Sequence, residues 1–391
     1  MKLSVQFYAV AAATLTAATL AAVVGPPVAS AHEDVSHYLF VPNRASADVT
    51  VIDTHSDRVI ARIDVGNVPH QVAVSDSLGK LVVSNTQDNT ISIVDLATMT
   101  VEATVALDVE PEHMQVSPGG GMIAVGNIGA GTISLVSLTE NRETARVVGL
   151  FEPHNLTFSP DGALLYVANL GANHVSVIDV AAGVVVNEIR VADPAAFAAL
   201  DSGGEYQGII NVTATPDGRL GFAAHGEGDT MAVIDLRTQE TVKHIALGDE
   251  PWRAFSTADG RYMLVPNNGD RTVSVISVAE LEVVATLPGA ADMTGINIGW
   301  FETTAFVISR GEQKAVVIDL VEMAVVGEIA LPGSPETGVV SPDGAKLYIA
   351  LSGSDQVAVI DTRSRKLVGT IDDVGSAPWG TTMVGTVNYC H

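Results

Sequence analysis

The sequence predicts an all-β protein: an eight-bladed β-propeller of four-stranded antiparallel blades, with the ring closed by the C-terminal strand. Three observations predict this fold. A unit of constant length recurs along the chain, each unit contains four short apolar runs, and a surplus strand follows the last unit. A unit of this size cannot bury its apolar faces alone, so it must stack on its neighbours, and the repeat dictates the architecture.

The repeat is measured from the first residue of the strand that ends in a VID-like motif. The eight anchor positions are Val49, Ile91, Ile133, Val175, Met231, Val273, Ala315 and Val357. All intervals between successive anchors are identical except the one from Val175 to Met231, which is longer. The extra length of this interval is predicted to be an insertion within 192–208.

The unit that begins at Pro153 illustrates the strands. Its apolar runs are NLTFS, LLYVAN, VSVIDV and VVVNEIRV, and their alternation is typical of β-strands. The segment Ser159–Gly162, SPDG, separates the first two runs and recurs at Thr215–Gly218 and Ser341–Gly344. Its Pro and Gly are suited to a tight turn. Each unit is therefore predicted to be one four-stranded antiparallel blade.

The two ends of the repeat array predict how the ring closes. The first copy lacks an inner strand, because only 32–37 precede Tyr38 in the chain that remains after signal cleavage. The segment Ala377–Val384, APWGTTMV, matches the start of a repeat. We expect this segment to complete the first blade and to remove open sheet edges.

These motifs resemble the YVTN-type β-propeller repeat family over essentially the whole mature chain. Leu165–Asn169 (LYVAN), Val175–Asp179 (VSVID) and the SPDG turn carry the resemblance. The count of eight blades also resembles the cytochrome d1-type propellers, which hold a haem d1 over the central channel. The resemblance is specific for fold and says little about chemistry, because one fold serves many functions.

The segment 1–31 resembles a secretory signal peptide. It contains Lys2, a long Ala-rich apolar run and the small-residue sequence Ala29–Ala31, which is typical of a cleavage site. The prediction is a signal peptide at 1–31 and a single propeller domain at 32–391, secreted or periplasmic, with a mature start at His32. An uncleaved membrane anchor is the alternative; no membrane span is expected after signal removal.

Charge and cysteine content restrict the partners. The chain has a net charge of −25, which becomes −26 without Lys2. Nucleic acid and anionic membrane surfaces would repel such a chain, so neither is expected as a partner. The acidity is compatible with a bound cation, a cationic patch on a partner, or solubility alone. The single cysteine, Cys390, excludes an intrachain disulfide.

Histidines cluster in the connections that enter three consecutive inner strands. Connections from strand four to the next strand one, and from strand two to strand three, open on one face of a propeller, called the upper face here. His70, His113 and His154 enter their inner strands from this face. Imidazoles that converge without a nearby cysteine suit copper or another transition metal. The alternative is that each histidine bonds the neighbouring blade.

A second upper-face position follows strand two, where the repeat prefers asparagine. The repeated residues are Asn43, Asn85, Asn127, Asn169 and Asn267. They are expected to satisfy loop backbone groups and to tolerate left-handed geometry. His225 and Arg310 replace asparagine in the fifth and seventh blades. His225 is therefore predicted to be a fourth metal ligand, with His174 as an alternative.

The cytochrome d1 resemblance implies a second kind of ligand, a haem d1-like cofactor. Its carboxylates would need basic partners, for which Arg253 and Arg310 are the upper-face candidates. Trp252 and Trp379 could wall a planar ligand, or could simply be packed aromatics. Because basic residues are few in the chain, we favour a metal over this cofactor. The segment 192–208 is a candidate lid or protein-binding loop.

Three functional hypotheses remain open on the sequence alone. The first is an exported propeller that binds a metal or redox cofactor at the upper channel mouth, catalytically or as a carrier. The second is a non-catalytic scaffold that binds a protein or a cell surface. The third, implied by resemblance to phosphogluconolactonase-type propellers, is a lactonase-like hydrolase. At the lower edge, His32, His37, Cys390 and His391 could hold Cu(I).

Overall fold

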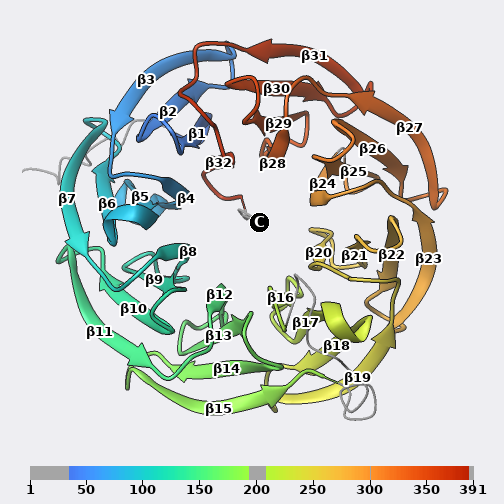
Figure 1. Ribbon diagram of the computed structural model, residues 1–391, viewed down its shortest axis with the longest axis horizontal. Helices are drawn as coiled ribbons and strands as arrows, with labels where there is room; N and C mark the ends of the chain where they lie inside the picture. The colour runs from blue at the N-terminus through green and yellow to red at the C-terminus, as the bar shows by residue number, and fades with distance from the viewer. Residues whose placement is uncertain (1–34, 193–207, 300, 387–391) are drawn as a thin grey trace, which may run out of the picture. The chain divides into compact units, whose positions relative to one another are not determined.

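The computed structural model describes residues 35–192, 208–299 and 301–386. These residues lie in one compact unit, Asp34–His391; the predicted signal peptide, 1–31, falls outside the described residues. Eight four-stranded sheets follow one another around a central channel (Figure 1). All strand pairs within them are antiparallel, and the predicted fold class is confirmed.

Each blade contributes one strand to each of four positions, numbered outward from the channel. The inner strands are β4 (Pro69–Ser75), β8 (Pro111–Val116), β12 (Pro153–Phe158), β16 (Thr213–Ala214), β20 (Phe255–Ser256), β24 (Met293–Gly299), β28 (Pro335–Val340) and β32 (Thr382–Met383). The second strands are β1 (Tyr38–Asn43), β5 (Lys80–Asn85), β9 (Met122–Asn127), β13 (Leu164–Asn169), β17 (Leu220–His225), β21 (Tyr262–Asn267), β25 (Thr304–Ser309) and β29 (Lys346–Leu351).

The third and fourth positions lie farther from the channel. The third strands are β2 (Asp48–Asp53), β6 (Thr90–Asp95), β10 (Thr132–Ser137), β14 (His174–Asp179), β18 (Thr230–Asp235), β22 (Thr272–Ser277), β26 (Lys314–Asp319) and β30 (Gln356–Asp361). The outer strands are β3 (Arg58–Asp64), β7 (Thr100–Ala106), β11 (Arg142–Val148), β15 (Val184–Arg190), β19 (Glu240–Ala246), β23 (Glu282–Pro288), β27 (Ala324–Ala330) and β31 (Lys366–Ile371). The short 3₁₀ turns are η1 (Asp76–Leu78), η2 (Thr86–Asp88) and η3 (Gly226–Gly228).

The core lies between the blades. Hydrophobic clusters join every adjacent pair of sheets, including the first and last, where Val41 packs with Tyr348 and Val359. The second and third strands are buried on both faces because each sheet is packed between two others. The outer strands alternate between exposed and partly buried residues, as the period of two requires.

The C-terminal segment closes the ring as predicted. β32 pairs with β1 through Leu39–Met383 and Phe40–Thr382, and completes the first sheet (Figure 1). The Trp379 backbone N–H also donates a hydrogen bond to the Pro42 carbonyl, at 3.0 Å. The last residues of the described chain therefore carry the inner strand of the first blade.

The SPDG turns have the predicted geometry. In the copy at 159–162, the Ser159 hydroxyl donates to Asp161 Oδ1 at 2.6 Å. Gly162 has a φ of 72°, which favours glycine because a side chain is strained there. The same hydroxyl-to-carboxylate bond recurs in the other two copies. These turns set the lower face, opposite the histidine-bearing connections.

The inner strand after the predicted insertion is short, as are the inner strands β20 and β32. Residues 193–207 of the insertion fall outside the described residues, so the predicted lid or partner loop stays a prediction. The inner strand that follows, β16, is confined to Thr213–Ala214. The described part of the chain contains no helix with the length and apolar character that a membrane crossing requires.

Candidate metal centre

Three histidines from neighbouring inner strands meet at the upper mouth of the channel. His70 on β4, His113 on β8 and His154 on β12 have 4%, 1% and 7% of their surface exposed. The Nε2 atoms of His113 and His154 are 3.0 Å apart. The ring of His70 lies edge-on to that of His113, with centroids 5.2 Å apart. The structure therefore brings together the three histidines that the repeat placed on adjacent blades.

A bulge in each inner strand sets the direction of these side chains. In β8, Pro111 pairs with Asn127 but Met114 pairs with Val125, so the register shifts between them. The same shift occurs in β4 and β12. Such bulges re-aim side chains beside the sheet edge. In β8 the residues at the bulge are Glu112 and His113.

The histidines do not occupy the same repeat position. Glu112 lies one repeat after His70 and one repeat before His154, whereas His113 occupies the next position. The bulge brings all four residues together despite this shift. The three histidines are therefore not equivalent in the repeat: the equivalent set is His–Glu–His, and His113 comes from the following position.

Glu112 is the site residue that the sequence reasoning missed. Its Oε2 lies 3.9 Å from His113 Nε2. One ligand atom from each of His70, Glu112 and His113 lies within 4.8 Å of the others. Burial raises the pKa of Glu112, with the Glu110 carboxylate adding to the effect and Arg44 opposing it. The available signal was the tripeptide Pro111-Glu112-His113, whose Glu falls in register with two histidines.

The orientation of His154 is held from behind. Its Nδ1 is 3.1 Å from the Ile210 carbonyl oxygen. A carbonyl can only accept, so Nδ1 is the donor, and Nε2, the other ring nitrogen, is turned toward His113. A hydrogen bond of this kind is how metal-binding histidines are held in one tautomer.

Trp379 and Arg44 stand beside the histidines. The Trp379 ring centre is 6.1 Å from that of His70, and Arg44 Cζ is 4.2 Å from the Trp379 ring centre. The guanidinium thus covers one aromatic face in a cation–π contact. Trp379 thus lies beside His70, with one of its faces covered by Arg44.

His225 has different neighbours. Its Nε2 is 2.7 Å from Asn173 Oδ1, in the loop between β13 and β14. Burial lowers its pKa, which the Asp229 carboxylate partly offsets and His244 reinforces. Among the described residues, the ligand group around His113 contains His70 and Glu112 and does not include His225. The role of His225 as a metal ligand stays a prediction.

The repeated asparagines clamp the second strand to the third. Asn127 Nδ2, for example, donates to Thr132 Oγ1 at 3.0 Å and to Ser134 Oγ at 2.9 Å. Asn85 Oδ1 also accepts a hydrogen bond from the Gly66 backbone, at 3.1 Å. None of the repeated asparagines has a positive φ. The expected role in satisfying polar groups is correct. The tolerance of asparagine for left-handed geometry is not used at these positions, because each asparagine is the last residue of an extended strand.

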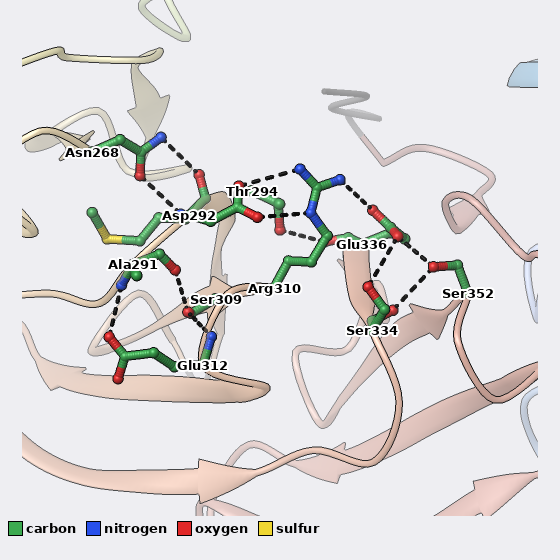
Figure 2. Close-up of polar contacts among 11 residues, drawn as sticks. Asn268, Ala291, Asp292, Thr294, Ser309, Arg310, Glu312, Ser334, Glu336 and Ser352 are labelled. Atoms are coloured by element: carbon green, nitrogen blue, oxygen red, sulfur yellow. Dashed lines mark hydrogen bonds and ion pairs between the residues drawn. The ribbon is translucent and has the colours of Figure 1, made fainter.

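Arg310 forms an ion-pair network in the seventh and eighth blades (Figure 2). Its Nε and Nη2 donate to the two carboxylate oxygens of Asp292, at 2.8 Å and 3.2 Å. Its Nη1 is 3.3 Å from Oε2 of Glu336, a residue that also accepts from Ser352. The Asp292 hydrogen bond is the largest cause of the raised pKa of Arg310. The structure thus shows Arg310 engaged by two carboxylates.

Arg253 and Trp252 lie in the sixth blade. Arg253 is fully buried, and its Cζ is 5.7 Å from the ring centre of Phe255. The Trp252 backbone N–H donates to the Pro266 carbonyl, at 2.9 Å. Their predicted role in holding a cofactor stays a prediction.

Farther along the inner strands, the channel contains a cavity of about 750 Å³. Uncharged polar side chains contribute to its lining, among them Gln71, Gln115 and Thr157. Gln71 Oε1 accepts from the Met114 backbone N–H, and Gln115 Oε1 accepts from that of Phe158. These amides tie neighbouring inner strands together and so stabilise the frame that carries the histidines.

The fold and the site define an eight-bladed propeller with a histidine–carboxylate cluster at one mouth of its channel. Comparison with known families identifies the family of this propeller. The chain belongs to the YNCE-like β-propeller family, which it matches over residues 73–388. This span covers nearly all of every blade except the first.

One curated relative is a seven-bladed β-propeller protein of Mycobacterium tuberculosis (strain ATCC 25618 / H37Rv). It is 33% identical over 129 residues, which are 32% of this chain and 33% of the relative. The match therefore spans about a third of the relative's length. The relative is described as seven-bladed, whereas this chain has eight sheets.

Two solved structures share the fold. Dihydro-haem d1 dehydrogenase NirN, in complex with DHE, is 17% identical with a TM-score of 0.75, over 92% of this chain and 78% of that one. Hydrazine synthase of Kuenenia stuttgartiensis is 23% identical with a TM-score of 0.58, over 75% of this chain and 95% of that one. At these identities the likeness shows the fold alone.

Proposed function

We propose that this protein binds a divalent transition metal, of the copper or zinc type, at the upper mouth of its channel. His70, Glu112 and His113 supply the first ligands, and His154 is the fourth. One observation carries the proposal: ligand atoms of the first three lie within 4.8 Å of one another, at the mouth of the channel. His154 Nε2 adds a donor 3.0 Å from His113 Nε2.

The donor chemistry supports such an ion. Imidazole nitrogens bind zinc at about 2.0–2.1 Å, so two nitrogens 3.0 Å apart can share one ion. Imidazole suits zinc, copper, iron and nickel, and the carboxylate adds a hard oxygen donor. The Ile210 carbonyl that holds His154 provides the outer support such a ligand needs.

Charge also favours a cation here. Burial raises the pKa of Glu112, and a bound dication would offset that cost by stabilising the carboxylate. The chain as a whole has a net charge of −25, which raises the local concentration of cations around it. Protons compete for the same imidazoles and carboxylate, so we expect metal affinity to fall as the pH is lowered.

A haem d1-like cofactor fits the described residues less well. Arg310 is bound by Asp292 and Glu336, and Arg44 stacks on Trp379. Arg310 and one face of Trp379, two of the candidate contacts for such a cofactor, are thus already in contact with other side chains. We favour a metal ion alone, in a protein exported through the leader expected at 1–31, and assign it no reaction.

The test is metal binding by the purified protein after removal of metal with a chelator. Calorimetric titration with Zn²⁺ and Cu²⁺ is compared between the wild type, Glu112→Gln and Glu110→Gln. Glu110 is exposed and belongs to the same connection, so it is a matched control. We expect Glu112→Gln to weaken one binding event at least about tenfold. Glu110→Gln, which acts on the site only through its charge, should weaken it far less.

His70→Gln and His154→Gln extend the test to the imidazoles, with the thermal transition recorded to verify the fold. Loss of the same binding event in both variants would support the site. If a histidine variant unfolds, the Glu112→Gln variant still tests the site. Glutamine has nearly the same shape as glutamate, so this change removes a ligand without disturbing the packing. Unchanged binding in all three variants would exclude the site and favour a scaffold function.

A further inference from the structure

A second group of metal-binding side chains lies at the lower edge of the first blade, away from the upper mouth. His37 precedes β1, Asp53 ends β2, and His55 lies in the turn between β2 and β3. Thr54 donates from its backbone N–H and from its hydroxyl to the His37 carbonyl, at 3.0 Å and 2.7 Å. These two bonds hold the segment before β1 against the turn.

The three side chains face one another. The rings of His37 and His55 are stacked, with centroids 4.7 Å apart and planes 19° from parallel. His55 Nδ1 is 3.7 Å from Asp53 Oδ1. One ligand atom from each residue lies within 4.8 Å of the other two. The group therefore has the spacing of a site that closes on a single ion with small side-chain movements.

Comparison with the other blades shows that the histidines depart from the repeat. The positions of His37 and His55 lie close together in every blade. In each case the residue just before the His55 position donates a backbone hydrogen bond to the carbonyl at the His37 position. The residues equivalent to His37 are Gly79, Gly121, Ala163, Arg219, Arg261, Thr303 and Ala345. The residues equivalent to His55 are Ala97, Thr139, Ala181, Arg237, Ala279, Val321 and Arg363. Only the first blade has histidine at either position, and it has histidine at both.

Asp53 is prepared to be the third ligand. Its Oδ1 accepts from the His55 backbone N–H at 3.0 Å, and its Oδ2 accepts from the Ser56 hydroxyl at 2.7 Å. Each carboxylate oxygen retains a further lone pair. The carboxylate is thus held in one orientation and retains acceptor positions for a cation.

We propose that His37, Asp53 and His55 form a second divalent-metal site, with zinc as its most suitable ion. Two imidazoles and one carboxylate are a donor set that binds zinc and leaves a coordination position for water or another ligand. The side chain of His55 is 79% exposed, so that position is reached from solvent. The proposal is independent of Glu112 and of the terminal residues His32, Cys390 and His391, which fall outside the described residues.

The repeat supplies the variants for the test. His37→Ala and His55→Ala each introduce a residue that other blades have at that position, as at Ala163 and Ala97. Both variants are therefore expected to fold. His174→Ala is the control, because His174 has a carboxylate nearby, Glu188 at 3.8 Å, but belongs to no group of three ligands among the described residues.

The measurement is the number of Zn²⁺ equivalents bound per chain after chelator treatment, by calorimetry and by metal analysis after gel filtration. We expect His37→Ala and His55→Ala each to bind one equivalent fewer than wild type, and His174→Ala to match wild type. We expect the double variant His55→Ala/Glu112→Gln to bind one fewer than either single variant. Full zinc content in both His37→Ala and His55→Ala, or an equal loss in His174→Ala, would overturn the proposal.

Discussion

Two sides of the channel mouth place a glutamate at the same repeat position and surround it differently. Glu112 lies beside His113 and near His70 in the second and third blades. Glu336 accepts hydrogen bonds from Arg310 and Ser352 in the seventh and eighth. On one side a permanent cation is part of the fold. On the other side, imidazoles gather around a carboxylate whose pKa is raised by burial.

The difference shows how a repeat protein separates stability from function. A guanidinium bound by carboxylates stabilises the blade interface without any added ligand. Imidazoles around a carboxylate add less by themselves, but they can bind a metal ion. The comparison therefore predicts that substitutions on the Arg310 side reduce stability, and that substitutions on the Glu112 side reduce metal affinity.

The largest expected effect concerns the closure that joins the two sides. Deletion of residues 380–391 removes β32 and the buried side chain of Met383. Loss of the Met383 burial alone costs about 1.5–3 kcal/mol. Loss of the buried Thr382 and Val384 and of the partner strand of β1 adds to this cost. Thermal melting should show a large decrease in the transition temperature. An unchanged transition would contradict the role of this strand in closure.

The next effect tests the ion-pair side. Arg310→Asn restores the residue that the repeat prefers but removes the cation from Glu336, whose side chain is 3% exposed. Breaking a buried pair costs about 3–5 kcal/mol; because the Arg310 side chain is 35% exposed, we expect about 3 kcal/mol. Denaturant unfolding measures this value, and zinc binding should be unaffected.

The double variant Arg310→Asn/Glu336→Gln sharpens that test. Arg310→Asn leaves the buried Glu336 carboxylate without its cation. Removing the charge of Glu336 as well should therefore recover part of the lost free energy of unfolding. If the loss of stability in the double variant equals the sum of the losses in the two single variants, the two residues are not coupled.

A third effect tests the Glu112 side through pH. The pKa of Glu112 is raised above its ordinary value of 4.5 in the folded protein. Its contribution to stability is therefore present below pH 4.5 and is lost as the pH rises through the raised pKa. Metal-free Glu112→Gln should lack this loss, so its free energy of unfolding should fall less over that range. Identical pH profiles would contradict the assignment.

Bound zinc should reverse the order of stability of wild type and Glu112→Gln. At a free zinc concentration about 100 times the dissociation constant, binding stabilises the folded state by about 2.7 kcal/mol. Wild type should gain this increment and Glu112→Gln should gain much less at the same zinc concentration. An equal gain would place the bound metal elsewhere.

The smallest effect concerns His225. Burial lowers its pKa below 6.5 in the folded protein, so its contribution to stability is present above pH 6.5 and is lost as the pH falls through the lowered value. His225→Asn, the residue of the repeat, should flatten the stability profile below pH 6.5. A steeper profile in the variant would contradict this interpretation.

The fold could be predicted in detail because it depends on a period. Each copy of the repeat located four strands, and the surplus segment near Thr382 identified the closing strand. These features are local patterns of apolar residues and turns, which the chain displays in order. The pairing of Thr382 with Phe40 follows from the strand that the first unit lacks.

The site was only partly predictable because it depends on geometry between blades. His70, His113 and His154 could be found by comparing copies, but the bulge that brings Glu112 among them leaves no mark in the apolar pattern. Arg310 was recognised as an exception, whereas its partners came from other segments of the chain. Likewise, His37 and His55 become neighbours only through the hairpin that joins them.

The most direct test of the central claim is anomalous diffraction at the zinc edge from crystals of the zinc-loaded protein. The account predicts a peak at the upper channel mouth, about 2.0–2.2 Å from the His113 Nε2 and a Glu112 oxygen, with His70 and His154 beside it. The peak should be lost in Glu112→Gln crystals grown at the same zinc concentration. Zinc-loaded wild-type crystals with no peak at these residues would contradict it.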